Sequence, residues 1–212
     1  MSDEELGEVG KARHAAIFST PLFTHVWDGD RELNAALRER ILDHMARQRG
    51  VAKSNRGGWH SEIGELEFCD APGRRLVARM RALGDEATRR VLAADQQRES
   101  AMRWSVTAWA NVNRQGDFNA VHVHPGSTWS GTYYVDAGEP VDADNGTSLQ
   151  LFDPCQGRST LYPPLGPASV YIRPKPGLMV LFPSYVPHMV FPHDGAGARI
   201  SVAFNLSGQP QS

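Results

Sequence analysis

The chain has 212 residues, 41% of them hydrophobic and 22% charged, and carries a formal net charge of -2 at pH 7. Such a composition is typical of a globular domain with a real core, and the nearly balanced charge excludes the basic stripe that nucleic-acid binding requires. No window approaches the roughly 18 apolar residues of a membrane span. We therefore expect neither nucleic acid nor a membrane as a partner.

Residues 1–16 are predicted to form a flexible tail. They are rich in acidic residues and lack the apolar segment of a secretory signal. The two cysteines, Cys69 and Cys155, lie far apart in the sequence and form no metal-type pair. We interpret them as buried free thiols in a reducing compartment, which predicts a cytoplasmic protein.

Two helices are predicted before residue 100. Residues 30–48 and 72–95 each place apolar side chains at helical spacing on one face, and Gly84 is expected to interrupt the second segment. Both helices should therefore pack by one face on the rest of the protein. The apolar faces are Leu33, Leu37, Ile41, Leu42 and Met45 in the first helix, and Leu76, Met80, Leu83, Val91 and Leu92 in the second.

After residue 100 the pattern changes to short strands separated by Gly, Pro, Asp and Asn. Without long helices between them, such strands favour a β-sandwich, jelly roll or small barrel. The expected fold class is mainly β (α+β), with the N-terminal helices packed on one sheet. The predicted strands are residues 105–113, 119–124, 128–135, 147–152, 168–174, 177–183 and 198–206, with one more after His188.

The length predicts one domain over residues 17–212. Its helical part would cover residues 17–100 and its β core residues 101–207. Sheet edges in such folds often pair with a second copy, which would give a homodimer.

The segment NAVHVH carries two histidines one residue apart. Because side chains alternate along a strand, His122 and His124 share one face, while Val121 and Val123 take the other, which we expect to be packed. Neutral imidazole is a good ligand for iron, zinc or copper. The pair is therefore a candidate metal site, with two surface histidines on an edge strand as the alternative.

A metal site needs a third ligand, and five residues downstream are candidates: Asp136, Asp144, Asp153, His188 and His193. His188 lies between apolar residues in LFPSYVPHMVF, where a polar ring needs a partner. That partner would be the metal or a backbone carbonyl. His193 lies in the loop-like PHDGAG and is expected to be exposed.

The strand ARISVAFNL has an apolar face and a second face that carries Arg199, Ser201, Ala203 and Asn205. The guanidinium of arginine binds a carboxylate by two parallel hydrogen bonds and keeps its charge. Arg199 is therefore either a carboxylate-binding residue beside a small hydroxyl or a surface ion-pair residue.

The order HxH, then His, then R-x-S resembles the iron(II)/2-oxoglutarate dioxygenase superfamily, and more closely a group of bacterial and phage 2OG-Fe(II) oxygenases. The segments that carry the resemblance are AWANVNRQGDFNAVHVHPGSTWSGTYYV, SLQLFDP, GLMVLFPSYVPHMVFP and RISVAFNL, with SNRGGWHS and FSTPLF further upstream. They span about residues 17 to 207.

The resemblance implies a double-stranded β-helix, which is a jelly roll, and an enzyme that hydroxylates an unknown small molecule or peptide while 2-oxoglutarate yields succinate and carbon dioxide. It implies that His122, His124 and His188 bind Fe(II), and that Arg199 and Ser201 bind the far carboxylate of 2-oxoglutarate. Asn113 and Tyr133 are further candidates for contact with the oxo-acid. No separate acid or base is implied.

The chain departs from most of the superfamily at His124, where an acidic residue is usual. The resemblance therefore leaves open whether His124, Asp136 or Asp153 is the middle ligand, and whether the site is active. Two other functions stay open. One is a three-histidine, cupin-like dioxygenase that uses no oxo-acid. The other is a non-catalytic β-sandwich that binds a partner through exposed tryptophans, namely Trp59, Trp104, Trp109 and Trp129.

Overall fold

A computed structural model describes residues 19–27, 30–92, 102–141, 146–160, 162–163 and 166–210. The predicted tail, residues 1–16, lies outside these ranges. The helices are α1 (Arg31–Arg47) and α2 (Asp70–Val91), with short 3-10 turns η2 (Glu67–Cys69) and η4 (Gln156–Thr160). The strands are β1 (Phe23–Val26), β2 (Asn55–Arg56), β3 (Trp59–His60), β4 (Met102–Asn113), β5 (Phe118–His122), β6 (Trp129–Asp136), β7 (Leu149–Phe152), β8 (Ser169–Ile172), β9 (Leu178–Pro183), β10 (His188–Val190) and β11 (Arg199–Pro210).

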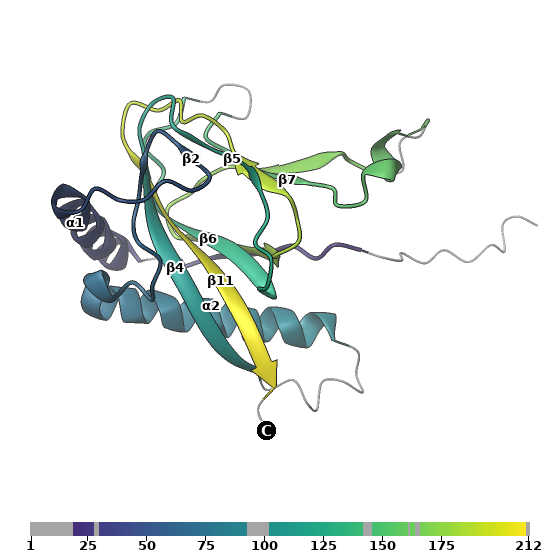
Figure 1. Cartoon of the computed structure of the whole chain (residues 1–212), viewed down its shortest axis with the longest axis horizontal. Coiled ribbons are helices and arrows are strands. Elements are labelled where there is room, and N and C mark those ends of the chain that lie inside the picture. Colours follow the sequence, from purple (N-terminus) through teal and green to yellow (C-terminus); the bar gives the residue numbers. More distant parts are fainter. Residues whose placement is uncertain are drawn as a thin grey trace, which may run out of the picture.

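The strands form two antiparallel sheets, as the mainly β prediction requires. The major sheet has the order β1-β9-β6-β11-β4-β3, and the minor sheet the order β2-β5-β10-β7-β8. In Figure 1, α2 runs along one side of β4 and β11, and the strands β2, β5 and β7 of the minor sheet lie toward the other side. The major sheet is thus covered by helices on one face and by the minor sheet on the other.

The larger apolar core lies between the helices and the major sheet. Leu33, Leu37 and Ile41 of α1 are buried there, which confirms the face predicted for this helix. The alternate residues of β11 meet them from the sheet, namely Ile200, Val202, Phe204 and Leu206. A smaller cluster, which includes Tyr134 and Phe182, fills part of the space between the two sheets.

The expected interruption at Gly84 was wrong, because α2 continues through this residue to Val91. A Cβ atom at Gly84 would lie 2.5 Å from Cδ1 of Leu206 and 3.4 Å from the ring of Trp104. The glycine therefore allows the helix to approach the sheet closely rather than ending the helix.

Two further expectations concern cysteine and membranes. Both cysteines are free, but only Cys69 is buried; Cys155 is exposed, which corrects the expectation of two buried thiols. None of the helices within the described ranges is both long and apolar enough to cross a membrane.

Substitution of Gly131 by alanine is expected to lower the free energy of unfolding by about 2–4 kcal/mol. Gly131 lies in β6, between β9 and β11, and a Cβ atom there would lie 2.4 Å from the carbonyl oxygen of Val180 and 2.5 Å from the ring of Phe204. Neither neighbour can move freely, since one is sheet backbone and the other is a buried core ring.

Urea unfolding of the variant measures this loss. Gly157→Ala is the matched control, because no atom of the described residues, its chain neighbours aside, lies within 4 Å of the added methyl group. Equal stability of the Gly131 variant and the wild type would contradict the close packing of β6.

Candidate active site

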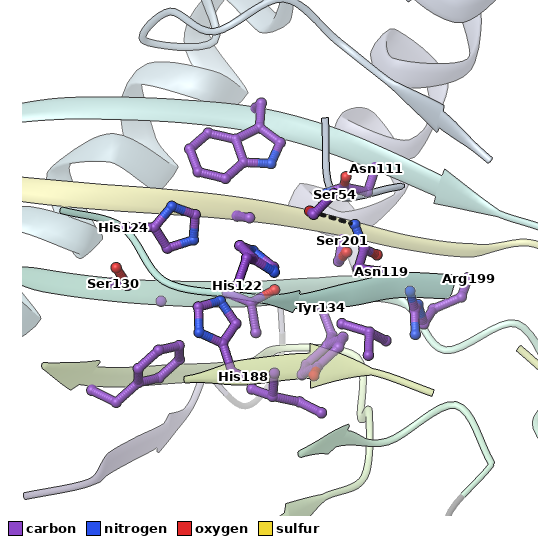
Figure 2. A pocket seen from close by; sticks show the side chains of 17 residues that line it. Ser54, Asn111, Asn119, His122, His124, Ser130, Tyr134, His188, Arg199 and Ser201 are labelled. Atoms are coloured by element: carbon purple, nitrogen blue, oxygen red, sulfur yellow. Dashed lines mark hydrogen bonds between the residues drawn. The ribbon is translucent and has the colours of Figure 1, made fainter. Parts of the chain in front are cut away.

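Three histidines converge between the two sheets. His122 is the last residue of β5 and His188 is the first residue of β10, and the antiparallel register of these two strands places the two residues directly opposite one another. His124 follows β5, where its backbone N–H donates to the carbonyl oxygen of Ser184 at 3.1 Å. Figure 2 shows the three rings directed into one shared space.

The distances allow the three imidazoles to hold a single ion. The ring centroids are 4.3 Å apart for His122 and His188, 4.9 Å for His122 and His124, and 5.1 Å for His124 and His188. One candidate ligand nitrogen from each ring lies within 4.8 Å of the other two. Among the described residues, no other group of three or more potential metal ligands converges in this way.

Two of the rings are fixed by backbone carbonyls. Nδ1 of His122 lies 2.7 Å from the oxygen of Ala120, and Nδ1 of His188 lies 2.9 Å from the oxygen of Val186. A carbonyl only accepts, so each Nδ1 carries the proton and donates it. The neutral rings therefore keep an unprotonated Nε2, as a metal ligand requires.

Burial keeps all three imidazoles neutral. It lowers the pKa of His122, lowers the pKa of His124 to about 4 and lowers the pKa of His188 to about 3; the charge of His122 further lowers the last two pKa values. Repulsion between protonated rings thus lowers these pKa values in the same direction as burial does. At neutral pH the rings do not have to release a proton before they bind a cation.

The metal-free protein is expected to lose stability as the pH falls from about 6.5 toward 4. An unfolded histidine takes up its proton near the ordinary pKa of 6.5, whereas folded His188 does so only at about 3. In this window the unfolded state binds more protons, so the free energy of unfolding falls by up to about 1.4 kcal/mol per pH unit for each such group.

Urea unfolding in the presence of a chelator, at several pH values from 7.5 to 4.5, measures the slope. His188→Gln should flatten it, since an amide does not titrate. A slope identical in the wild type and this variant would show that His188 is not held neutral by the fold.

Arg199 lies further along the same pocket, at the first residue of β11. The pocket extends from the three histidines to Arg199 and Ser201, and Tyr134 lies between them (Figure 2). Arg199 is 1% exposed, so its charge is buried. Burial lowers the pKa of this guanidinium, yet an arginine remains charged at neutral pH.

The partners of Arg199 are neutral. Nη1 donates to the carbonyl oxygen of Thr147 at 3.1 Å, and Nη2 donates to Oδ1 of Asn113 at 2.8 Å. Nε is buried without a hydrogen-bond partner, and no carboxylate of the described residues forms an ion pair with this side chain. A buried cation without a counter-ion is costly, and an anionic ligand would remove that cost.

The position of Thr147 depends on a buried histidine. Thr147 has a φ of 69°, and its hydroxyl donates to Nδ1 of His193 at 2.5 Å, while Nε2 of His193 donates to the oxygen of Gly197 at 2.7 Å. His193 is 1% exposed, so the expectation of an exposed loop residue was wrong. This histidine supports the carbonyl that holds Arg199, a role that its loop-like sequence did not indicate.

The expected contact between Tyr133 and the oxo-acid is corrected by the structure. Tyr133 faces the helices, where it is fully buried and its hydroxyl donates to Oδ1 of Asn34 at 2.7 Å. The neighbouring Tyr134 lines the pocket instead. Burial raises the pKa of Tyr134 to about 12, against the effect of the charge of Arg199, so the phenol keeps its proton and can donate it.

The candidate Asn113 and the nearby Asn111, both on β4, occupy different places. Asn113 is buried and holds Arg199, as described above. Asn111 lines the pocket, and its Oδ1 is buried without a hydrogen-bond partner among the described residues. Ser201 also lines the pocket, two residues along β11 from Arg199 and opposite Asn111 on β4.

The aspartates considered as metal ligands in place of His124 do not lie with the other two histidines. Asp136 forms an ion pair with Arg38 of α1 at 3.2 Å and accepts from the backbone of Gly138. Asp153 follows β7 and accepts from the backbone N–H of Cys155 at 2.9 Å. Neither belongs to the group of converging ligands, and Asp144 lies outside the described residues.

Two expectations about exposure were wrong. Val121 is 57% exposed and Val123 is 40% exposed, so the valines of NAVHVH face solvent and its histidines face inward. Of the four tryptophans that favoured a partner-binding sandwich, Trp104, Trp109 and Trp129 are buried and Trp59 is half-buried, so they form no exposed aromatic face.

Comparison with known proteins finds one matching family model and several solved structures of similar fold. Residues 107–205 match a family model described as "Putative 2OG-Fe(II) oxygenase". The matched range contains all three histidines, Arg199 and Ser201. No sequence of a curated protein matches the chain.

Several solved structures share the fold. A prolyl-4-hydroxylase of Pseudomonas putida is 18% identical, with a TM-score of 0.62 over 89% of this chain and 93% of that chain. HygX of Streptomyces hygroscopicus, solved with nickel and 2-oxoglutarate bound, is 10% identical, with a TM-score of 0.58 over 89% of this chain and 83% of that chain. A prolyl hydroxylase of Trichoplax adhaerens, in complex with a peptide fragment of hypoxia inducible factor, is 15% identical, with a TM-score of 0.56 over 88% of this chain and 83% of that chain.

At these identities the likeness establishes the fold, and it confirms the double-stranded β-helix with helices on one sheet. The family match adds the reaction type and the cofactors, Fe(II) and 2-oxoglutarate. The sequence of residues 107–205 and the fold of the chain are therefore similar to those of the 2OG-Fe(II) oxygenases.

Proposed function

We propose that the protein hydroxylates a C–H bond of an organic substrate, with release of succinate and carbon dioxide. Two features in one pocket carry this proposal. Three neutral imidazoles converge at one end, and at the other end lies a buried arginine that forms no ion pair with any of the described residues. A dicarboxylic oxo-acid is the kind of ligand that serves both, with one end at the metal and the other at the guanidinium.

His122, His124 and His188 would hold Fe(II). The donor set fits this ion, because imidazole suits iron and leaves ligand positions open for other groups. Three neutral ligands leave the full positive charge on the ion, which favours anionic co-ligands. When bound, Fe(II) and 2-oxoglutarate supply the oxygen activation that the protein side chains lack.

Arg199 would bind the far carboxylate of 2-oxoglutarate. Its Nη1 and Nη2 donate to Thr147 and Asn113, which fixes the plane of the guanidinium, and its buried Nε has no hydrogen-bond partner among the described residues. Ser201 and Tyr134 line the same part of the pocket with hydroxyl groups that can donate to a carboxylate. Asn113 therefore positions Arg199, while Ser201 and Tyr134 contact the oxo-acid.

We also propose that residues 17–212 act as one domain in a cytoplasmic enzyme. The helices share their core with the major sheet, so neither part buries its apolar face without the other. Both cysteines are free thiols, which suits a reducing compartment.

Anaerobic reconstitution with Fe(II), followed by addition of 2-oxoglutarate, tests the cofactor assignment. A weak visible absorption band of the chelated oxo-acid is expected for the wild type. Admission of oxygen should then yield succinate, which a three-histidine dioxygenase without an oxo-acid would not produce. Iron binding with neither band nor succinate would favour that alternative.

A further inference from the structure

A second space opens at the three histidines, on the side toward solvent. It is an open groove with a volume of about 520 Å³, within the size range of sites for small organic ligands. Ser54, Trp109, His122 and His124 line both this groove and the pocket that reaches Arg199. A molecule in the groove would therefore lie next to the proposed metal without occupying the place of the oxo-acid.

One wall of the groove is a short segment attached to the strand of His122. The pairing of β2 with β5 places Asn55 opposite Asn119 and Arg56 opposite Phe118. Ser54 accepts from the backbone N–H of Ala120 at 2.9 Å, and its hydroxyl lies 3.3 Å from Nδ2 of Asn119, the bond that Figure 2 marks. The segment is thus fixed relative to the proposed iron ligands.

Two cations lie on this segment, Lys53 and Arg56, and both line the groove. Nη1 of Arg56 donates to the carbonyl oxygens of Lys53 and Asn55 at 3.2 and 3.1 Å, which leaves Nε and Nη2 without acceptors among the described residues. The lining residues of the groove include no acidic side chain. The charge of the groove is therefore positive and not neutralised by its own walls.

The remaining surface of the groove combines an apolar wall with a polar floor. Val121 and Ile63 are 57% and 52% exposed and border the groove. His60 is buried against Trp109, with ring centroids 5.5 Å apart and planes 9° apart. Nδ1 of His60 donates to the oxygen of Ser61 at 2.5 Å, so Nε2 of the neutral ring is an acceptor.

We propose that this groove is the substrate site, and that its substrate carries an anionic group joined to an apolar segment. Lys53 and Arg56 bind the anion, the apolar wall with Val121 binds the apolar segment, and the adjoining carbon is brought to His122 and His124. The reaction at this groove rests on the proposed function. The binding of the anion by Lys53 and Arg56 does not depend on it.

Matched probes test the anion preference directly. The iron-loaded protein is saturated with 2-oxoglutarate under anaerobic conditions, so that Arg199 is occupied, and is titrated by calorimetry with N-acetyl-leucine and with neutral N-acetyl-leucinamide. The acid is expected to bind about tenfold more tightly than the amide. The double variant Lys53→Ala/Arg56→Ala should bind both probes alike.

The control is Arg31→Ala/Arg74→Ala, which removes two exposed cations from α1 and α2 and should keep the preference. Equal binding of the two probes, no saturable binding of the acid, or an unchanged preference in Lys53→Ala/Arg56→Ala would each overturn the proposal. Failure of the proposed function is recognised separately, by the absence of the visible band. In that case the titrations are repeated on metal-free Arg199→Ala protein, where the acid preference still decides whether the groove binds anions.

Discussion

Arg199→Ala is expected to weaken 2-oxoglutarate binding by at least about 100-fold while iron affinity changes little. The variant removes a buried guanidinium whose two terminal nitrogens are already fixed by Thr147 and Asn113. Hydrogen bonds to a charged group contribute about 1.5–3 kcal/mol each, and a carboxylate left without its cation in a buried site binds poorly. The metal ligands lie on other strands and are unchanged.

Anaerobic calorimetry of the iron-loaded protein measures the oxo-acid affinity, and metal analysis of the same sample measures iron. Arg199→Lys is the informative second variant, because it keeps the charge but loses the planar fork, and should fall between wild type and alanine. Arg103→Ala, an exposed arginine on β4, is the control. Unchanged oxo-acid affinity in Arg199→Ala would remove Arg199 from its proposed role.

His188→Ala is expected to abolish stoichiometric iron uptake. His188 is the most buried of the three histidines, and its ring is oriented by the carbonyl oxygen of Val186. Without it two imidazoles remain, on residues of one short segment. The loss of a direct ligand should exceed the 10–100-fold loss of affinity that removal of an outer partner typically causes.

Iron content after anaerobic loading and desalting measures this effect, and circular dichroism checks that the variant is folded. His44→Ala is the control, because His44 lies in α1, where it stacks on Phe68 of η2, away from the site. One iron bound tightly by His188→Ala would show that another residue is the distal ligand.

The alternation of side chains along strands predicted which residues share a face. It grouped His122 with His124, and Arg199 with Ser201, and the structure places each group on one face. Tyr133 and Trp129 also share one face of β6, and both contact the helices. The assignment of Tyr133 to the oxo-acid was wrong because alternation does not say which of two faces meets the pocket; that is decided by the side of the major sheet that the helices cover.

Because alternation does not say which of two faces is packed, the burial predicted for Val121 and Val123 was also wrong. A run of apolar and polar residues suggests that the apolar set is packed, yet the outer face of the minor sheet at β5 is open, and Val121 and Val123 are exposed. The inward face is the polar one, since it forms the wall of a pocket. At a ligand site the usual pattern of burial is reversed, and the sequence alone does not mark where this happens.

The sequence by itself determined the change from helices to strands near residue 100, the pairs of residues that share strand faces, and a motif order typical of one enzyme superfamily. The tertiary structure decided the rest: the direct pairing of His122 with His188, the support of Arg199 by Thr147 and His193, and the position of Lys53 and Arg56 beside the histidines. These contacts join residues far apart in the chain. Local periodicity reports only on neighbours along one strand or helix, whereas strand register and sheet packing bring together the groups that share a site.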